Sequence, residues 1–140
     1  MKQNGFSLIE LMVVVAIMAF LAMIAVPNFN RFLAKAKRAE AYMNLNSIYA
    51  AEKAYFAEHD MYSDVLMGEN GIGWKPEGKT HYSYGFSGAE GRNNFMGKSG
   101  AQIQGSRADK TGFRAVAASE KDIITVDENN NIVIVQDGLK

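Results

Sequence analysis

The feature that most constrains the fold of this chain is an apolar run close to its N-terminus. From Phe6 to Val26 there are 21 residues, of which only Ser7 and Glu10 are polar. As an α-helix this run is about 31 Å long, enough to cross a bilayer core of roughly 30 Å. A secretory signal peptide has a shorter apolar core with a small-residue cleavage site after it, whereas this run leads into more helix-favouring sequence. The run therefore predicts a transmembrane helix that the mature protein keeps.

Pro27 lies at the end of the apolar run. Proline has no backbone N–H, and its ring collides with the preceding turn of a helix. Sharp kinks in helices commonly occur at proline. We therefore expect a bend or a local melting of the helix near residue 27.

Glu10 is an acid placed where water is scarce. A carboxylate at membrane depth is costly and needs a partner or a purpose. Residues 3–30 contain no Lys, Arg or His, so the counter-charge has to be an amine terminus or another molecule. The alternative is that Glu10 lies at the membrane interface and stays hydrated. The apolar run by itself does not choose between these two interpretations.

The residues around the start of the run carry a resemblance to a known family. Lys2 and Gly5, then the sequence FSLIEL at 6–11, the unbroken apolar run and Pro27 resemble the class III signal of type IV pilins and type II secretion pseudopilins. The resemblance implies that a prepilin peptidase cuts between Gly5 and Phe6, and that Phe6 is then N-methylated.

The same resemblance gives Glu10 and Pro27 a role in assembly. Glu10 matches the position of the family's glutamate, which is thought to meet the positive amine of a neighbouring subunit's first residue in the filament. Such a buried ion pair fixes register more than it adds stability, because desolvation offsets much of the attraction. The implied organisation is a leader peptide over 1–5, a transmembrane and filament-core helix over 6–27, and a globular head over 28–140.

Composition limits the remaining classes of function. A chain of 140 residues that is 48% hydrophobic has room for one compact domain besides the membrane segment. The formal net charge is zero, so nothing at the level of the whole chain indicates nucleic acid as a required partner. There is no cysteine, which excludes disulfides, thiol catalysis and cysteine-ligated metals within these residues.

Four basic residues follow the apolar run: Arg31, Lys35, Lys37 and Arg38. A count of positive charges on the two sides of the run would place the C-terminal part in the cytoplasm. The resemblance implies the opposite orientation, with the head outside the cytoplasm, and we follow it because the motif is specific. The group is either a solvated or headgroup-facing surface, or a docking surface for acids on adjacent heads.

A second helix is predicted from Asn28 to His59, a segment without Gly or Pro that is rich in Ala, Leu, Lys and Glu. Its apolar positions recur every three or four residues and mark one face for packing on a sheet. These positions are Ala41, Leu45, Ile48 and Tyr55, with Ala34 and Ala51 nearby. Together with the apolar run, this segment is expected to form one long helix with an apolar transmembrane half and an amphipathic second half.

Strands are predicted after the helix. Residues 80–87 alternate as a half-buried strand does, and 112–119 is another candidate. The segments 122–126 and 131–135 flank a turn-rich DENNN and predict a hairpin. The fold class is therefore α+β, and by resemblance it is the pilin fold, a long N-terminal helix packed on an antiparallel sheet of three or four strands.

Residues 88–111 predict a long loop with little periodicity, of a length that is commonly functional or mobile. By resemblance, loops beside the sheet form the variable surface of the fibre. The chain departs from many pilins because it lacks the cysteine pair that closes their C-terminal loop. What fastens that region therefore has to be something other than a disulfide.

No motif predicts catalysis or a cofactor. The stretch 91–99 approaches a phosphate-binding loop but has five residues, not four, between its first glycine and Gly-Lys-Ser. Asp127, Asn129 and Asn131 share the opening spacing of a calcium loop without its glycine and glutamate, so a hairpin turn is favoured and calcium is the alternative. His59 and His81 have no partners at ligand spacing. We expect no enzyme, no resident metal and no cofactor.

The resulting hypothesis is a structural subunit of a type IV pilus-like filament. Its expected partners are copies of itself, prepilin peptidase, inner-membrane assembly machinery and, before assembly, membrane lipid. It is expected in the inner membrane as a single-pass precursor and then in an extracellular pilus. The alternative within the family is a major pseudopilin in a periplasmic pseudopilus, and the alternative of another class is a single-span envelope protein that binds a ligand and never polymerises. Adhesion, twitching motility, DNA uptake and protein secretion all stay open.

Overall fold

A computed structural model of the chain describes residues 5–86, 94–105 and 107–139. Contacts divide the chain into two units, residues 1–36 and residues 37–140, and each is described by itself. The predicted leader lies outside the described residues except for Gly5, as do residues 88–93 and 106 of the predicted loop.

One helix, α1, runs from Leu8 to His59 and has 52 residues. Both predicted helical segments are therefore confirmed. Pro27 lies inside α1 and the helix is not interrupted there, so of the expected bend or local melting near residue 27 the melting is wrong, and the bend stays a prediction. The φ angle that proline imposes is compatible with a helix, and the cost falls on the backbone hydrogen bond that its nitrogen cannot donate and on the contact of its ring with the preceding turn. The side chain of the next residue, Asn28, donates to the carbonyl of Ile24 at 3.2 Å.

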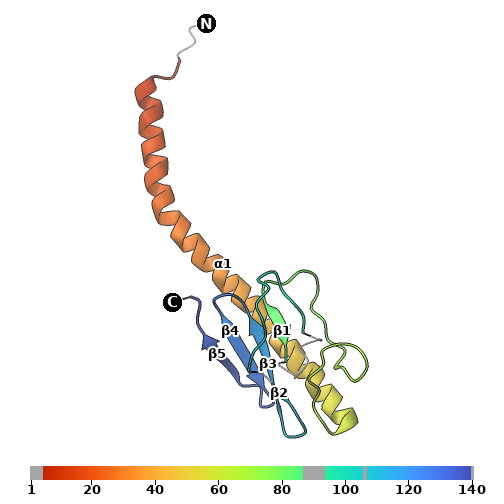
Figure 1. The fold of residues 1–140 in the computed structure, drawn as a ribbon. Helices are drawn as coiled ribbons and strands as arrows, with labels where there is room; N and C mark the ends of the chain where they lie inside the picture. The colour runs from red at the N-terminus through yellow and green to blue at the C-terminus, as the bar shows by residue number, and fades with distance from the viewer. Residues whose placement is uncertain (1–4, 87–93, 106, 140) are drawn as a thin grey trace. The chain divides into compact units, whose positions relative to one another are not determined.

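The second unit holds an antiparallel sheet (Figure 1). Its strands are β1 (Ser83–Gly85), β2 (Arg107–Ala108), β3 (Phe113–Ala118), β4 (Ile123–Asp127) and β5 (Ile132–Gln136). The order is β1-β3-β4-β5, and β2 pairs with β3 as well. The α+β class is confirmed. The sheet has five strands, where three or four were predicted. The added strand, β2, has two residues, too few for an alternating pattern to be visible in the sequence.

The main core lies between α1 and the sheet. Ala41, Leu45 and Ile48 of α1 are fully buried, which confirms three positions of the predicted helical face. Tyr55 is only half-buried; its ring stacks on that of His59 at the end of the helix, with 4.1 Å between ring centroids. Across from the helix the core continues into the sheet through Tyr84, Phe113, Ala115, Ala117, Ile124 and Val126.

The other face of the sheet carries a second, smaller core. Val116 and Ala118 of β3 pack there against Ile103, which comes from the predicted loop. Phe95 of the same loop pairs with Tyr84 of β1 through two backbone hydrogen bonds of 2.8 Å. Phe95 thus pairs along the edge of β1, and Ile103 packs on the outer face of β3; all three residues of β1 are buried and not half-buried as the alternation predicted. The approach is close, because a Cβ on Gly97 would overlap the backbone of Tyr82.

Candidate assembly site

The side chains of the apolar run are exposed throughout the first unit. From Phe6 to Leu33 the large hydrophobic side chains are between 45% and 86% exposed. By length and composition this part of α1 is able to cross a membrane, and none of its most apolar window is buried within the chain. Soluble monomers rarely expose an apolar surface of this extent, so lipid or other protein has to cover it.

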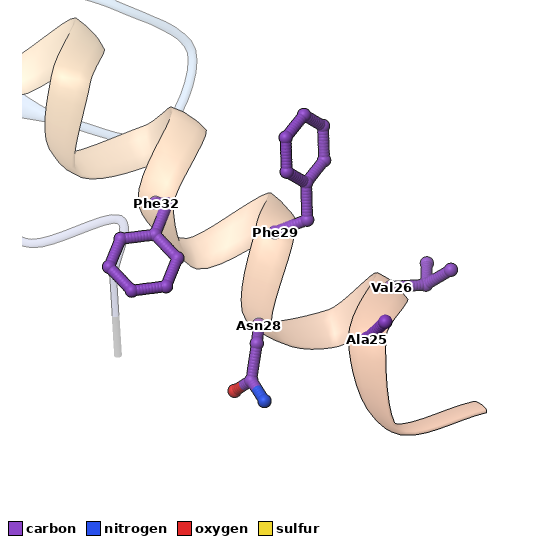
Figure 2. A pocket seen from close by; sticks show the side chains of 5 residues that line it. All are labelled: Ala25, Val26, Asn28, Phe29 and Phe32. Carbon is purple, nitrogen blue, oxygen red and sulfur yellow. The ribbon is translucent and has the colours of Figure 1, made fainter. Parts of the chain in front are cut away.

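A shallow depression lies on this exposed surface, on the turns around and after Pro27. It is lined by Ala25, Val26, Asn28, Phe29 and Phe32. Figure 2 shows the rings of Phe29 and Phe32 projecting away from the helix, and the two side chains are 62% and 68% exposed. The lining is almost entirely apolar, which suits another apolar side chain and not a charged ligand.

The predicted cleavage position lies just before the helix. Gly5 and Phe6 precede the first helical residue, Leu8, and both are exposed. A Cβ placed on Gly5 would meet nothing within 4 Å, so the peptide bond between Gly5 and Phe6 is not enclosed by the described residues. An exposed, non-helical peptide is what a peptidase needs in order to bind the chain in an extended form.

Ser7 and Glu10 bond to each other across the first turn of α1. The Glu10 carboxylate oxygen Oε2 accepts hydrogen bonds from the backbone N–H and from the Oγ hydroxyl of Ser7, both at 2.9 Å. In return, the backbone N–H of Glu10 donates to Ser7 Oγ at 3.3 Å. This reciprocal arrangement is a capping box, which satisfies N–H groups that a helix start leaves without partners. The sequence analysis missed Ser7, although the spacing Ser-x-x-Glu before an apolar run is a recognised signal for it.

Arg38 lies in the second unit and is not part of a solvated or docking surface. Its side chain is 11% exposed and forms ion pairs with Asp122 at 2.8 Å and Asp137 at 2.6 Å. The basic group was expected to form either a solvated or headgroup-facing surface or a docking surface for acids on adjacent heads. Both expectations are wrong for Arg38, because the acids that it pairs with lie within its own chain. The hydrogen bond to Asp122 is the main reason why the pKa of Arg38 is raised.

Asp122 connects Arg38 to two further parts of the head, at Tyr82 and at Gly138. Its oxygens also accept hydrogen bonds from the Tyr82 hydroxyl at 2.7 Å and from the backbone N–H of Gly138 at 3.3 Å. Burial, followed by the bond to Asp122, raises the pKa of Tyr82. The helix, the start of β4 and the residues after β5 thus meet at one ion-pair cluster. This cluster fastens the C-terminal region without a cysteine pair.

Glu52 is a fully buried acid of α1. Its oxygen Oε2 accepts the backbone N–H of Ser63 at 3.2 Å, and no described residue donates to Oε1. Burial raises the pKa of Glu52 to about 7, and the nearby charge of Asp64 adds to the effect. No sequence signal could have found it, because a glutamate in a helix-favouring segment is usually exposed.

The residues considered for metal or phosphate have structural contacts. Asp127 Oδ1 accepts the backbone N–H groups of Asn129 and Asn131 at 3.0 and 2.8 Å, which closes the hairpin between β4 and β5. His81 binds the Glu40 carboxylate through its ring Nδ1 at 2.8 Å. No group of three metal-ligating side chains occurs among the residues that the structure describes. Residues 91–93 of the near-phosphate-loop stretch lie outside the described residues.

Comparisons with known proteins find one matching family model and several relatives. Residues 1–26 match the family model described as the prokaryotic N-terminal methylation motif. The chain is 49% identical over 90 residues to the type IV major pilin protein PilA of Myxococcus xanthus (strain DK1622), over 64% of this chain and 40% of that protein. It is 36% identical over 62 residues to the type IV major pilin protein PilE1 of Neisseria gonorrhoeae, over 44% of this chain and 29% of that protein.

A secretion-system protein is also among the relatives. The type II secretion system core protein G of Pectobacterium carotovorum subsp. carotovorum is 33% identical over 75 residues, over 54% of this chain and 48% of that protein. The chain thus spans less than half the length of each of these three relatives. The chain thus combines a matched N-terminal methylation motif, a long helix followed by an antiparallel sheet, and similarity to type IV major pilins and to a type II secretion system core protein.

Proposed function

We propose that this chain is the structural subunit of a type IV pilus-like filament. The observation that carries the proposal is an apolar helical surface that is exposed from Phe6 onwards and lies largely within a matched N-terminal methylation motif, residues 1–26. A single subunit leaves that surface uncovered, and lipid and the helices of other copies are both apolar enough to cover it. The function is therefore assembly and not catalysis.

The proposed sequence of events starts in the inner membrane. The precursor is held there by residues 6–27 with its head outside the cytoplasm, prepilin peptidase removes residues 1–5 by cutting between Gly5 and Phe6, and Phe6 is N-methylated. The inner-membrane assembly machinery then draws the subunit from lipid into the filament. Exchanging lipid contacts for helix contacts gives no large hydrophobic gain, so close packing and the pairing of Glu10 with an amine carry the specificity.

The test is the mass and the location of the mature protein. Cells that make the chain are sheared, and the intact mass of the protein is measured in the released material and in the envelope. A mass of residues 6–140 plus one methyl group in the sheared material supports the surface pilin. An uncut mass in both fractions contradicts the whole proposal, and it would favour the non-polymerising envelope protein.

A second candidate is the major pseudopilin of a type II secretion system. It is favoured by the similarity to core protein G, of which the match covers 48%, more than of either pilin relative described above. In this case the processed and methylated mass occurs in the envelope alone. Deletion of the chain would then stop secretion of exported proteins and leave surface filaments unchanged.

A further inference from the structure

The two hydrogen bonds that Glu10 accepts from Ser7 go to the same oxygen. The backbone N–H and the hydroxyl of Ser7 both donate to Oε2 at 2.9 Å, and no described residue donates to Oε1. Of the two carboxylate oxygens of Glu10, only Oε2 is therefore held within the subunit. Both residues follow the proposed cut after Gly5, so they stay in the chain when the leader is removed.

A held carboxylate is a better partner for a cation than a freely rotating one. A glutamate side chain loses rotamer freedom when it forms an ion pair, and that loss opposes association. The bonds from Ser7 restrict the side chain of Glu10 before any partner arrives, so part of the entropy cost is met within the subunit. In an apolar fibre the ion pair also has to be well oriented, because desolvation removes most of its benefit otherwise.

We infer that Ser7 is a positioning residue, whose hydroxyl holds Oε2 of Glu10 so that Oε1 is presented to the positive amine of a second copy of this chain. The inference rests on the proposed function, in which Glu10 pairs with such an amine. It adds that the pairing depends on a residue that does not contact the amine itself. It also assigns the two oxygens different tasks, one within the subunit and one between subunits.

Substitutions at Ser7 separate positioning from simple capping of the helix. Threonine keeps the hydroxyl, alanine removes both the cap and the hydroxyl, and glycine removes the hydroxyl at little cost to the helix start. If Ser7 only stabilises the helix, Ser7→Gly behaves almost as the unchanged chain does. If Ser7 positions Glu10, Ser7→Gly and Ser7→Ala are impaired to a similar degree and Ser7→Thr is not.

The experiment measures sheared filament per processed subunit, with the processed amount determined by intact mass in the membrane fraction. We expect Ser7→Ala and Ser7→Gly to lower the ratio about fivefold, the effect of losing one hydrogen bond to Glu10, and Ser7→Thr to keep it unchanged. A normal ratio for Ser7→Gly, a failure of Ser7→Thr, or a loss of cleavage in the Ser7 variants would each overturn the inference.

Glu10→Gln distinguishes this inference from the function on which it rests. Glutamine retains an oxygen that accepts the Ser7 bonds but has no charge to pair with an amine. Normal filament from Glu10→Gln therefore contradicts the proposed ion pair. Impaired assembly of Glu10→Gln together with normal assembly of Ser7→Gly keeps the ion pair and rejects the positioning role of Ser7.

Discussion

Arg38 and Asp122 lie 84 positions apart in the sequence and form a two-pronged ion pair, with Nε to Oδ2 at 2.9 Å and Nη2 to Oδ1 at 2.8 Å. Arginine matches the geometry of a carboxylate through two parallel donors, which lysine does not. The pair fixes α1 against the start of β4. Because Arg38 also reaches Asp137, the residues after β5 are held by the same side chain.

Removing Arg38 should destabilise the head strongly. Arg38→Ala leaves Asp122 buried without its cation, and breaking a buried pair typically costs about 3–5 kcal/mol. The free energy of unfolding is measured by urea titration of the full chain in detergent, followed by the fluorescence of Trp74, the one tryptophan of the chain. Lys37→Ala is the matched control, because its exposed side chain is next in sequence and should change stability by less than about 0.5 kcal/mol. Equal effects of the two substitutions would contradict the role of Arg38.

Glu52 should make the stability of the head depend on pH. Its folded pKa of about 7 lies above the ordinary value of 4.5, so the folded state binds more protons than the unfolded state between these values. The stability contribution is therefore present below pH 4.5 and is lost as pH rises through about 7. By pH 8 the loss should be on the order of 3 kcal/mol.

The comparison that isolates Glu52 is Glu52→Gln, which keeps an acceptor for the Ser63 N–H. The free energy of unfolding of both proteins is measured by urea titration from pH 4 to pH 8. The unchanged chain should lose stability relative to Glu52→Gln as pH rises, since the variant has no charge to bury. Parallel curves over the whole range would show that Glu52 is not the titrating group.

Glu10→Ala should leave membrane insertion intact and impair filament assembly. Alanine is favourable in an apolar helix, so nothing opposes insertion, but the proposed pairing with an amine is lost. The measurement compares the amount of protein in the membrane fraction with the amount in sheared material. A normal yield of filament from this variant would refute the assembly role of Glu10.

Phe29 and Phe32 should contribute to assembly without contributing to the stability of the head. Their rings are exposed in the single chain, and burying one such side chain is worth about 1.5–3 kcal/mol. Replacing both with alanine should therefore lower filament yield at least about tenfold, at an unchanged free energy of unfolding. Met43→Ala, at an exposed apolar position of the second unit, is the control and should assemble normally. Loss of head stability in the double variant would contradict the prediction.

Much of the fold follows from local patterns in the sequence. The apolar run and the periodic positions Ala41, Leu45 and Ile48 predict α1 because a helix repeats every 3.6 residues. The hairpin of β4 and β5 is predictable because Asp127 begins a turn-forming segment between two apolar runs. The capping box at Ser7 also has a local signal, since its partner lies three residues further along the chain.

The contacts that the sequence did not predict are the long-range ones. Nothing near Arg38 in the sequence indicates that its partner is Asp122. A basic residue that follows three others within two helical turns favours a surface position instead. Glu52 is buried because the segment around Ser63 folds over it, a contact between residues 11 positions apart that leaves no periodic signal. Strand β2 depends on pairing with β3 and not on its own two residues.

The ion-pair cluster at Arg38 has a consequence for how the head reaches its folded form. A covalent bridge needs an oxidant to form and an isomerase to correct its mistakes. Ion pairs form and separate within the folding transition itself, so incorrect contacts at the C-terminal end of the chain are corrected without an enzyme. The head is accordingly expected to fold at the same rate under reducing and oxidising conditions.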